Sequence, residues 1–181
     1  MSWEIVEMKS FLSERKGRFK PNDDKIKGLK RIEKIDFSGN IFLSDKTSNT
    51  DMILIKHGDL VISGINVEKG AMSIYKGEED VIATIHYSSY EYNLEKIDLD
   101  FLRHFLKSSE FLEALKDQVP GGIKTEIKPK HILPLKVCIP KNVDDQRKVV
   151  SFLDKHNKTI ERQSTELTHQ LDLVKQLRQA F

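Results

Sequence analysis

Short apolar runs separated by turn-forming residues fill the chain between about residue 29 and residue 85. The breaks hold glycine beside polar residues, as in Ser38-Gly39-Asn40 and His57-Gly58-Asp59, and such sequences favour tight turns. Short apolar runs bounded by turns are typical of β-strands. The pattern therefore predicts hairpins or a small curved sheet, with strands at Ile32 to Phe37, Ile41 to Leu43, Met52 to Ile55, Leu60 to Ile62, Met72 to Tyr75 and Val81 to Ile85.

The period of the apolar positions changes further along the chain. From Leu99 onward apolar residues recur at spacings of three and four, which predicts one helix or two, ending near Val119. Asp98 can cap the first turn. Ile132 to Ile139 is predicted to be another strand, and Pro134 within it indicates an edge strand or a bulge.

The last segment is predicted to form one long helix from about Asp144 to Phe181, with Asn142 as a possible N-cap. Its apolar seam repeats every seven residues, at Leu153, Ile160, Leu167, Val174 and Phe181, beside companion positions Val150, Asn157, Ser164, Leu171 and Arg178. Such a helix extends about 55 Å, well beyond the roughly 15 to 17 Å radius expected for the preceding domain. The heptad pattern predicts a coiled-coil partner; the alternative is a core helix folded back onto its own domain.

Together these elements predict an α+β protein. A mostly β domain with a small helical part would occupy residues 1–141, and a coiled-coil helix residues 142–181. The composition, 38% hydrophobic and 32% charged over 181 residues, fits a folded protein. No apolar run is long enough for a membrane helix, so we expect a cytoplasmic protein. The single cysteine, Cys138, excludes an internal disulfide and is expected to be a small buried hydrophobe.

Charge is unevenly distributed. The total is only +2, but ten basic residues stand against four acidic ones from Lys9 to Lys34, a local net charge of +6. A basic surface of this kind suits contacts with nucleic-acid phosphates, although a solvated charge run would look the same in sequence.

Several strings in this order resemble the specificity subunits of type I restriction-modification enzymes. They are Gly58-Asp59-Leu60-Val61-Ile62-Ser63, the helix from Asp98 to Leu106, the glycine loop from Gly121 to Pro129, the passage from Leu135 to Gln146, and the helix end from Gln176 to Phe181. Lys141 to Val143 departs from the family by lacking the usual second proline. The chain also has one recognition domain where full-length members have two, so we expect a half subunit or a piece of a longer one.

The resemblance implies a mechanism. Each recognition domain would read one half of a bipartite site in double-stranded DNA, and paired antiparallel helices would act as a spacer. A DNA methyltransferase subunit would dock beside them, and possibly a restriction subunit. Adenine methylation from S-adenosylmethionine and ATP-driven restriction would belong to those partners. This chain would be non-catalytic, with no cofactor or metal of its own.

Sequence readout needs polar side chains on loops that enter a groove, with Lys and Arg on phosphates. Three predicted loops qualify, at 63–69, 86–90 and 121–128. Their candidate contacts are Ser63, Asn66, Lys69, Tyr87, Ser88, Ser89, Tyr90, Lys124, Thr125 and Lys128. The phosphate candidates are Arg15, Lys16, Arg18, Lys20, Lys30 and Arg31.

A half subunit is expected to form a homodimer through its helix, which would give a palindromic split site. The docking residues would be Val150, Leu153, Ile160, Leu167, Leu171, Val174 and Phe181.

Two alternatives come from other classes of protein. Asp117 followed by Glu126-Ile127-Lys128 imitates the metal-binding pattern of restriction nucleases, although Pro129 follows at once and Asp117 falls on a predicted helix. The other is an interaction protein whose β domain binds protein rather than DNA. The six histidines show no ligand-like spacing, and Asp98 and Asp100 suit helix capping better than a carboxylate pair.

Overall fold

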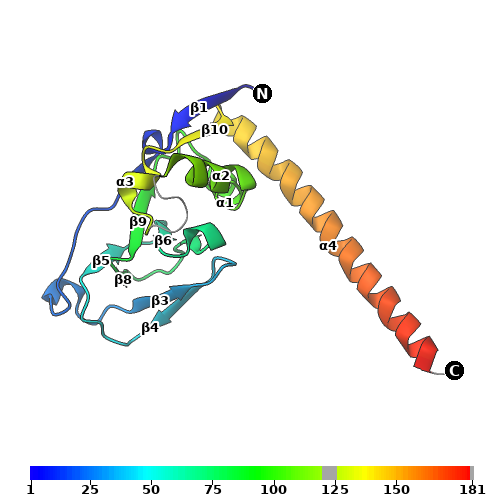
Figure 1. The fold of residues 1–181 in the computed structure, drawn as a ribbon, viewed down its shortest axis with the longest axis horizontal. Coiled ribbons are helices and arrows are strands. Elements are labelled where there is room, and N and C mark those ends of the chain that lie inside the picture. Colours follow the sequence, from blue (N-terminus) through cyan, green and yellow to red (C-terminus); the bar gives the residue numbers. More distant parts are fainter. Residues whose placement is uncertain (120–125, 180–181) are drawn as a thin grey trace.

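The computed structural model describes residues 1–119 and 126–179, which form three sheets and a long helix (Figure 1). The first sheet pairs β1 (Trp3–Glu7) with β10 (Lys136–Pro140). The second has the order β2 (Leu12–Glu14), β9 (Tyr87–Tyr92), β6 (Leu60–Ser63), β7 (Met72–Ile74). The third has the order β4 (Ile41–Ser44), β3 (Arg31–Ile35), β8 (Val81–Thr84), β5 (Met52–Ile55).

Strand β6 lies between two cores because its side chains alternate between opposite faces. Leu60 and Ile62 join the larger core, which is shared with helices α1 (Leu99–Phe105) and α2 (Ser109–Gln118). Val61 points into the smaller core with residues of β3, β5 and β8. All four residues of β6 are therefore buried.

Local signals in the sequence explain the turns and the helix starts. Gly39 and Gly58 have φ of 89° and 86°, a conformation that side chains with a Cβ rarely adopt, at the turns after β3 and β5. Asp98 caps α1 as predicted, because its carboxylate accepts hydrogen bonds from the backbone N–H groups of Asp100 and Phe101. The predicted helical region is two helices, and Ser108 caps the second.

The structure corrects three expectations. Tyr87 to Tyr92 form β9, inside a sheet, where we expected a loop. Ile132 ends the short helix α3 (Pro129–Ile132), so the strand after it begins only at Lys136, beyond Pro134. Strands β1 and β2 lie in a segment for which no strand was predicted.

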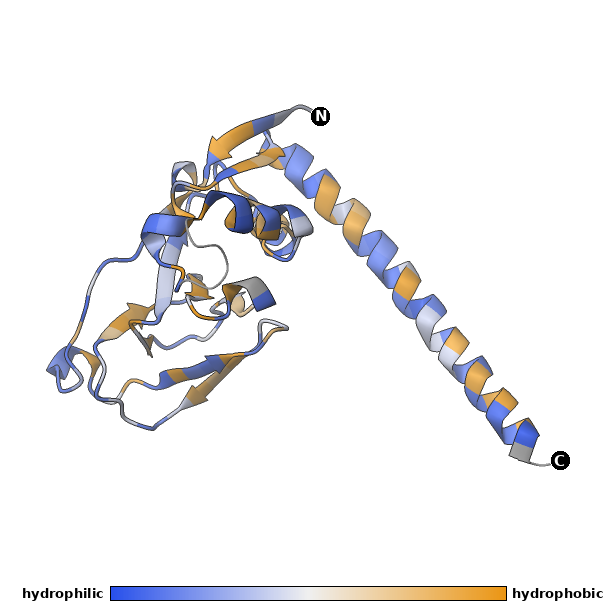
Figure 2. Ribbon diagram, in the orientation of Figure 1, coloured by the Kyte–Doolittle hydropathy of each residue, from blue (hydrophilic) through white to orange (hydrophobic). Residues whose placement is uncertain are grey.

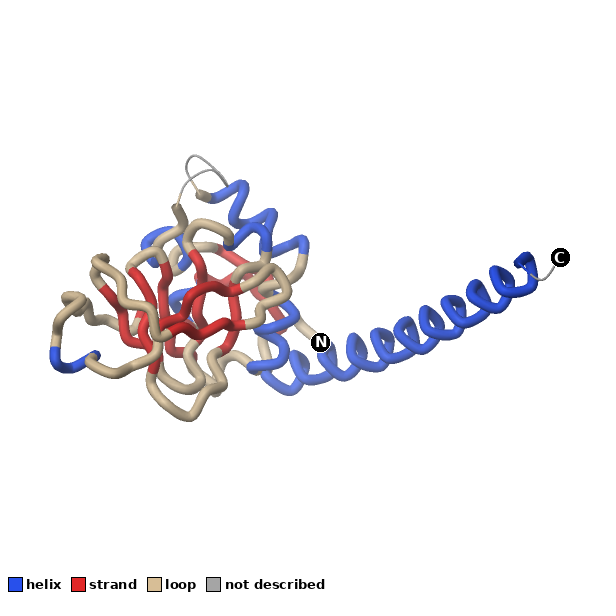
Figure 3. Tube along the Cα trace, turned by 90° about the horizontal axis from the view of Figure 1, so that it is seen from below, coloured by secondary structure: helices blue, strands red, loops and turns tan. Residues whose placement is uncertain are grey.

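Helix α4 (Val143–Gln179) leaves the domain near the N-terminus and projects away from it in both views (Figures 1 and 3). Val149 and Val150 pack against the larger core, but every residue from Asp154 to Arg178 is exposed. Apolar residues recur along this free part (Figure 2). Within the described residues, no helix is both long and apolar enough to cross a membrane.

Candidate nucleic-acid interface

Three segments that lie far apart in the sequence meet at Gly64. The Gly64 N–H donates to the His86 carbonyl oxygen at 2.8 Å. The Ile127 N–H donates to the Gly64 carbonyl oxygen at 2.7 Å. Parts of all three predicted loops are thus joined at one place.

Only glycine fits this junction. A Cβ added to Gly64 would lie 2.4 Å from the Ile127 carbonyl oxygen and 3.0 Å from that of His86. Both neighbours are backbone atoms, which cannot move aside as the end of a side chain can. The absence of a side chain therefore allows the segments to approach each other.

Polar side chains from two of these segments contact one another beside the junction. The His86 Nδ1–H donates to Glu126 Oε1 at 2.9 Å, and Lys128 Nζ lies 3.2 Å from Glu126 Oε2. The hydrogen bond from His86, followed by that from Lys128 and the positive charge of Lys128, lowers the pKa of Glu126 although partial burial opposes this. Glu126 is therefore an anion held between two basic groups.

These side chains line a groove of about 430 Å³ whose wall includes residues 14–18. Lys16 and Arg18 are exposed, so the groove combines the basic N-terminal segment with parts of two predicted loops. The sequence suggested each segment separately, and the fold brings them together. The clustered positive charge suits a polyanion.

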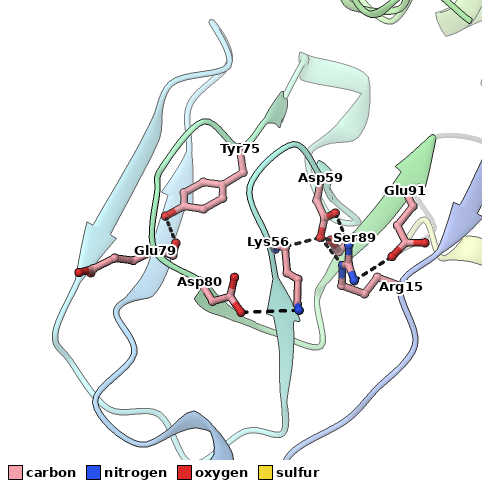
Figure 4. Close-up of polar contacts among 8 residues, drawn as sticks. All are labelled: Arg15, Lys56, Asp59, Tyr75, Glu79, Asp80, Ser89 and Glu91. Atoms are coloured by element: carbon pink, nitrogen blue, oxygen red, sulfur yellow. Dashed lines mark hydrogen bonds and ion pairs between the residues drawn. The ribbon is translucent and has the colours of Figure 1, made fainter. Parts of the chain in front are cut away.

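Arg15 has a different role from the one we expected. Its Nη2 donates to Asp59 Oδ1 at 2.8 Å, its Nε contacts Oδ2, and its Nη1 lies 2.8 Å from Glu91 Oε1 (Figure 4). The hydrogen bond to Asp59 raises the pKa of Arg15. Arg15 is therefore an internal anchor of the fold.

Asp59 is the buried centre of this cluster, with its side chain only 3% exposed. It also accepts hydrogen bonds from the Ser89 hydroxyl at 2.8 Å and from the Lys56 backbone N–H at 2.9 Å. A buried carboxylate is costly unless it is paired in this way. The cluster fixes the start of the basic segment against β6 and β9.

The predicted contacts on residues 87–90 lie in a strand and are mostly buried. Ser88, Ser89 and Tyr90 are buried in β9, and Tyr87 packs partly against the smaller core. Burial also raises the pKa of Tyr90. Ser89 carries a hydroxyl into the interior because Asp59 accepts its hydrogen bond, which the sequence alone did not indicate.

The remaining candidates are spread over the domain. Ser63 is buried at the end of β6, whereas Asn66 is half-buried and Lys69 is exposed, with its Nζ 5.6 Å from the centre of the Phe37 ring. Lys20 pairs with Asp51 at 3.1 Å, and Arg31 donates to the Lys46 carbonyl oxygen. Lys30 is exposed. Lys124 and Thr125 lie outside the described residues.

The predicted seam of α4 lies partly against the domain and partly exposed beyond it. Val150 and Leu153 are half-buried at the domain, whereas Ile160, Leu167, Leu171 and Val174 are 51–62% exposed. Phe181 lies outside the described residues. Phe152, which falls between two seam positions of the heptad count, is 61% exposed.

The structure also shows where the residues that suggested a nuclease lie. Asp117 is exposed on α2, and Glu126 contacts His86 and Lys128. In residues 1–119 and 126–179, no group of three or more His, Cys, Asp or Glu side chains is arranged to hold a metal ion.

Neither a protein-family model nor a curated protein matches the sequence. Solved structures are similar in fold, and the chain spans about half their length. One is a chain from the structural study of "complex assembly and conformational transition of the type I R-M system", with a TM-score of 0.72 and 14% identity over 95% of this chain and 47% of that one. The HsdS subunit from Thermoanaerobacter tengcongensis has a TM-score of 0.71, also at 14% identity, with 95% and 47% covered.

The S subunit of a type I restriction-modification system from M. genitalium is similar as well. Its TM-score is 0.52 at 16% identity, over 89% of this chain and 40% of that one. The α+β fold predicted from the sequence, with a mostly β domain followed by a long helix, is confirmed. The resemblance to specificity subunits is thus matched in three dimensions.

Proposed function

We propose that the chain is a DNA-recognition half of a type I specificity subunit, with a recognition domain at residues 1–141 and a spacer helix at residues 142–181. The observation that carries the proposal is the convergence of the basic segment and two predicted loops on one groove. The names of the solved structures of similar fold agree with this role.

The groove would bind DNA through two kinds of contact. Lys16, Arg18 and Lys128 are exposed cations that can neutralise phosphates, which gives affinity without sequence preference. Sequence preference would come from the polar residues of the predicted loops, such as Asn66, Lys124 and Thr125.

Helix α4 would pair with the same helix of a second copy. The exposed seam is apolar at Ile160, Leu167, Leu171 and Val174, and isolated apolar residues at heptad spacing gain stability when a partner helix covers them. An antiparallel pair would place two recognition domains about a twofold axis. The expected DNA site is then split and palindromic.

The chain would carry out no reaction itself. A DNA methyltransferase subunit would dock on the assembly and bind S-adenosylmethionine, and a restriction subunit would use ATP. DNA as the partner implies work in the cytoplasm. The role of this chain would be to set where on DNA those partners act.

Duplex binding at several salt concentrations tests the proposal. With the methyltransferase subunit present, affinity for DNA should fall by orders of magnitude between about 50 and 200 mM salt. The double variant Lys16→Ala/Arg18→Ala should weaken binding and reduce the salt slope by about 2. The matched control Lys25→Ala/Lys27→Ala removes two exposed charges from the same basic segment outside the groove and should change little.

Absence of salt-sensitive duplex binding would rule out the DNA role and favour the interaction-protein alternative. Mapping adenine methylation in the source genome tests the dimer independently. A split palindromic motif is expected, and a non-palindromic motif assigned to this chain would exclude the symmetric pair.

A further inference from the structure

A carboxylate in a groove lined by basic side chains is unfavourable for a phosphate-binding surface. Glu126 lies along the same groove as Lys16, Arg18, His86 and Lys128, and Glu14 lines this groove as well. A phosphate oxygen brought to its carboxylate would be repelled, because both groups are anionic acceptors. A hydrogen-bond donor of the DNA, by contrast, could approach Glu126 favourably.

The structure holds this carboxylate in a fixed position. His86 contacts one oxygen at 2.9 Å and Lys128 the other at 3.2 Å, while the next residue is bound to Gly64 through its backbone. The side chain is 31% exposed, so part of it faces solvent. An ionised carboxylate can accept about four hydrogen bonds, and these two contacts leave acceptor capacity free.

The contacts of Glu126 also keep its carboxylate ionised. The hydrogen bond from His86 lowers the pKa of Glu126, and the contacts with Lys128 lower it further. The group therefore remains an acceptor at neutral pH, with no proton to donate.

The donors that B-DNA offers in the major groove are the amino groups of cytosine and adenine. Adenine presents its N7 acceptor beside the amino group, which would repel a carboxylate. Cytosine presents only the N4 amino donor there. We propose that Glu126 is a specificity-determining residue that accepts a hydrogen bond from the N4 amino group of a cytosine in the DNA half-site. This inference rests on the proposed DNA-binding function and deepens it.

A purely internal role for Glu126, as a brace between His86 and Lys128, predicts different behaviour. Loss of a brace would lower the stability of the fold and weaken binding to all duplexes alike. Loss of a base contact would change the preference at one position and leave the others as they were.

Selection of bound duplexes from a randomised pool, followed by sequencing, separates these roles. The wild-type protein with its methyltransferase subunit should require cytosine at one position. In Glu126→Gln, that preference should fall by about 5- to 100-fold and shift toward adenine, because a glutamine amide pairs with adenine N6 and N7. Affinity for a non-specific duplex should rise severalfold, since a negative charge has left the groove.

Lys16→Ala is the matched control, because it removes a cation of the same groove that takes no part in the two contacts holding Glu126. It should weaken binding to all sequences without changing the preferred base. An unchanged preference in Glu126→Gln, or uniform weakening together with a lower melting temperature, would overturn the inference while leaving the proposed function intact. If the wild-type protein bound no duplex at all, the proposed function would fail first and the base contact with it.

Discussion

The backbone N–H of Asp98 donates a 2.7 Å hydrogen bond to Oε1 of Gln146, which lies 48 residues further along the chain. The Nε2 group of the same glutamine donates to the carbonyl oxygens of Lys96 at 3.1 Å and Pro140 at 3.0 Å. Gln146 is fully buried. One amide therefore joins the base of α4 to the cap of α1 and to the end of β10.

Replacing Gln146 with leucine should lower the free energy of unfolding by about 2–4 kcal/mol, because three backbone groups, of which that of Pro140 is buried, would lose their partners. Chemical denaturation measures the loss. The neighbouring Arg147→Ala, which removes an exposed side chain, should cost less than about 1 kcal/mol. Equal midpoints for Gln146→Leu and the wild type would contradict this view of the joint.

Arg15 and Lys16 are adjacent basic residues that should respond in opposite ways to substitution. Arg15→Ala leaves the buried Asp59 carboxylate without its cation and should destabilise the fold by about 3 kcal/mol. Lys16→Ala should leave stability within about 0.5 kcal/mol of the wild type. It should instead reduce the salt slope of duplex binding by about 1. Thermal unfolding and binding titrations of both variants measure these effects. A less stable Lys16→Ala variant, or an Arg15→Ala variant with unchanged stability, would contradict the prediction.

Gly64→Ala tests the junction of the three segments. The added Cβ would meet two carbonyl oxygens, so the joined segments must shift, at a cost of about 1–3 kcal/mol. Duplex affinity should fall as well, because the groove loses its shape. The adjacent Ile65→Ala alters an exposed side chain and should be close to neutral in both assays. Full binding by Gly64→Ala would show that the junction does not shape the interface.

Leu171→Glu should abolish self-association through α4 while the β domain stays folded. A charge placed in the seam would be buried against the partner helix, at a cost that no nearby group offsets. Gln176→Glu adds the same charge on the opposite face of the helix and should leave the dimer intact. Light scattering gives the mass and circular dichroism the fold. A dimer of normal mass from Leu171→Glu would exclude this seam as the contact.

Local signals made much of the fold predictable. The strands at Met52–Ile55 and Leu60–Ser63, the cap at Asp98 and the long final helix all follow from patterns within a few residues of each other. Such patterns fix which backbone conformation is favourable and which face becomes buried. The free length of α4 was predictable for the same reason, because a helix of its length exceeds the radius of the domain.

The predictions were wrong where a polar residue has its partner far away in the sequence. Ser89 looked like a loop residue, yet it lies in β9 because Asp59 accepts its hydrogen bond. Arg15 looked like one of several exposed cations, yet the same carboxylate holds it. Neither pairing produces a periodic pattern of residues that could be recognised in the sequence.

The sequence by itself determined the strands from β3 to β8, the helices α1, α2 and α4, the basic segment and the exposed seam of the final helix. Only the tertiary structure decided which distant residues meet: Gly64 with His86 and Ile127, Glu126 with His86, and Gln146 with Asp98. The physical reason is that hydrophobic periodicity is a property of neighbouring residues. A hydrogen bond across 40 or more residues depends on how the sheets and helices pack, and that is where the candidate interface is formed.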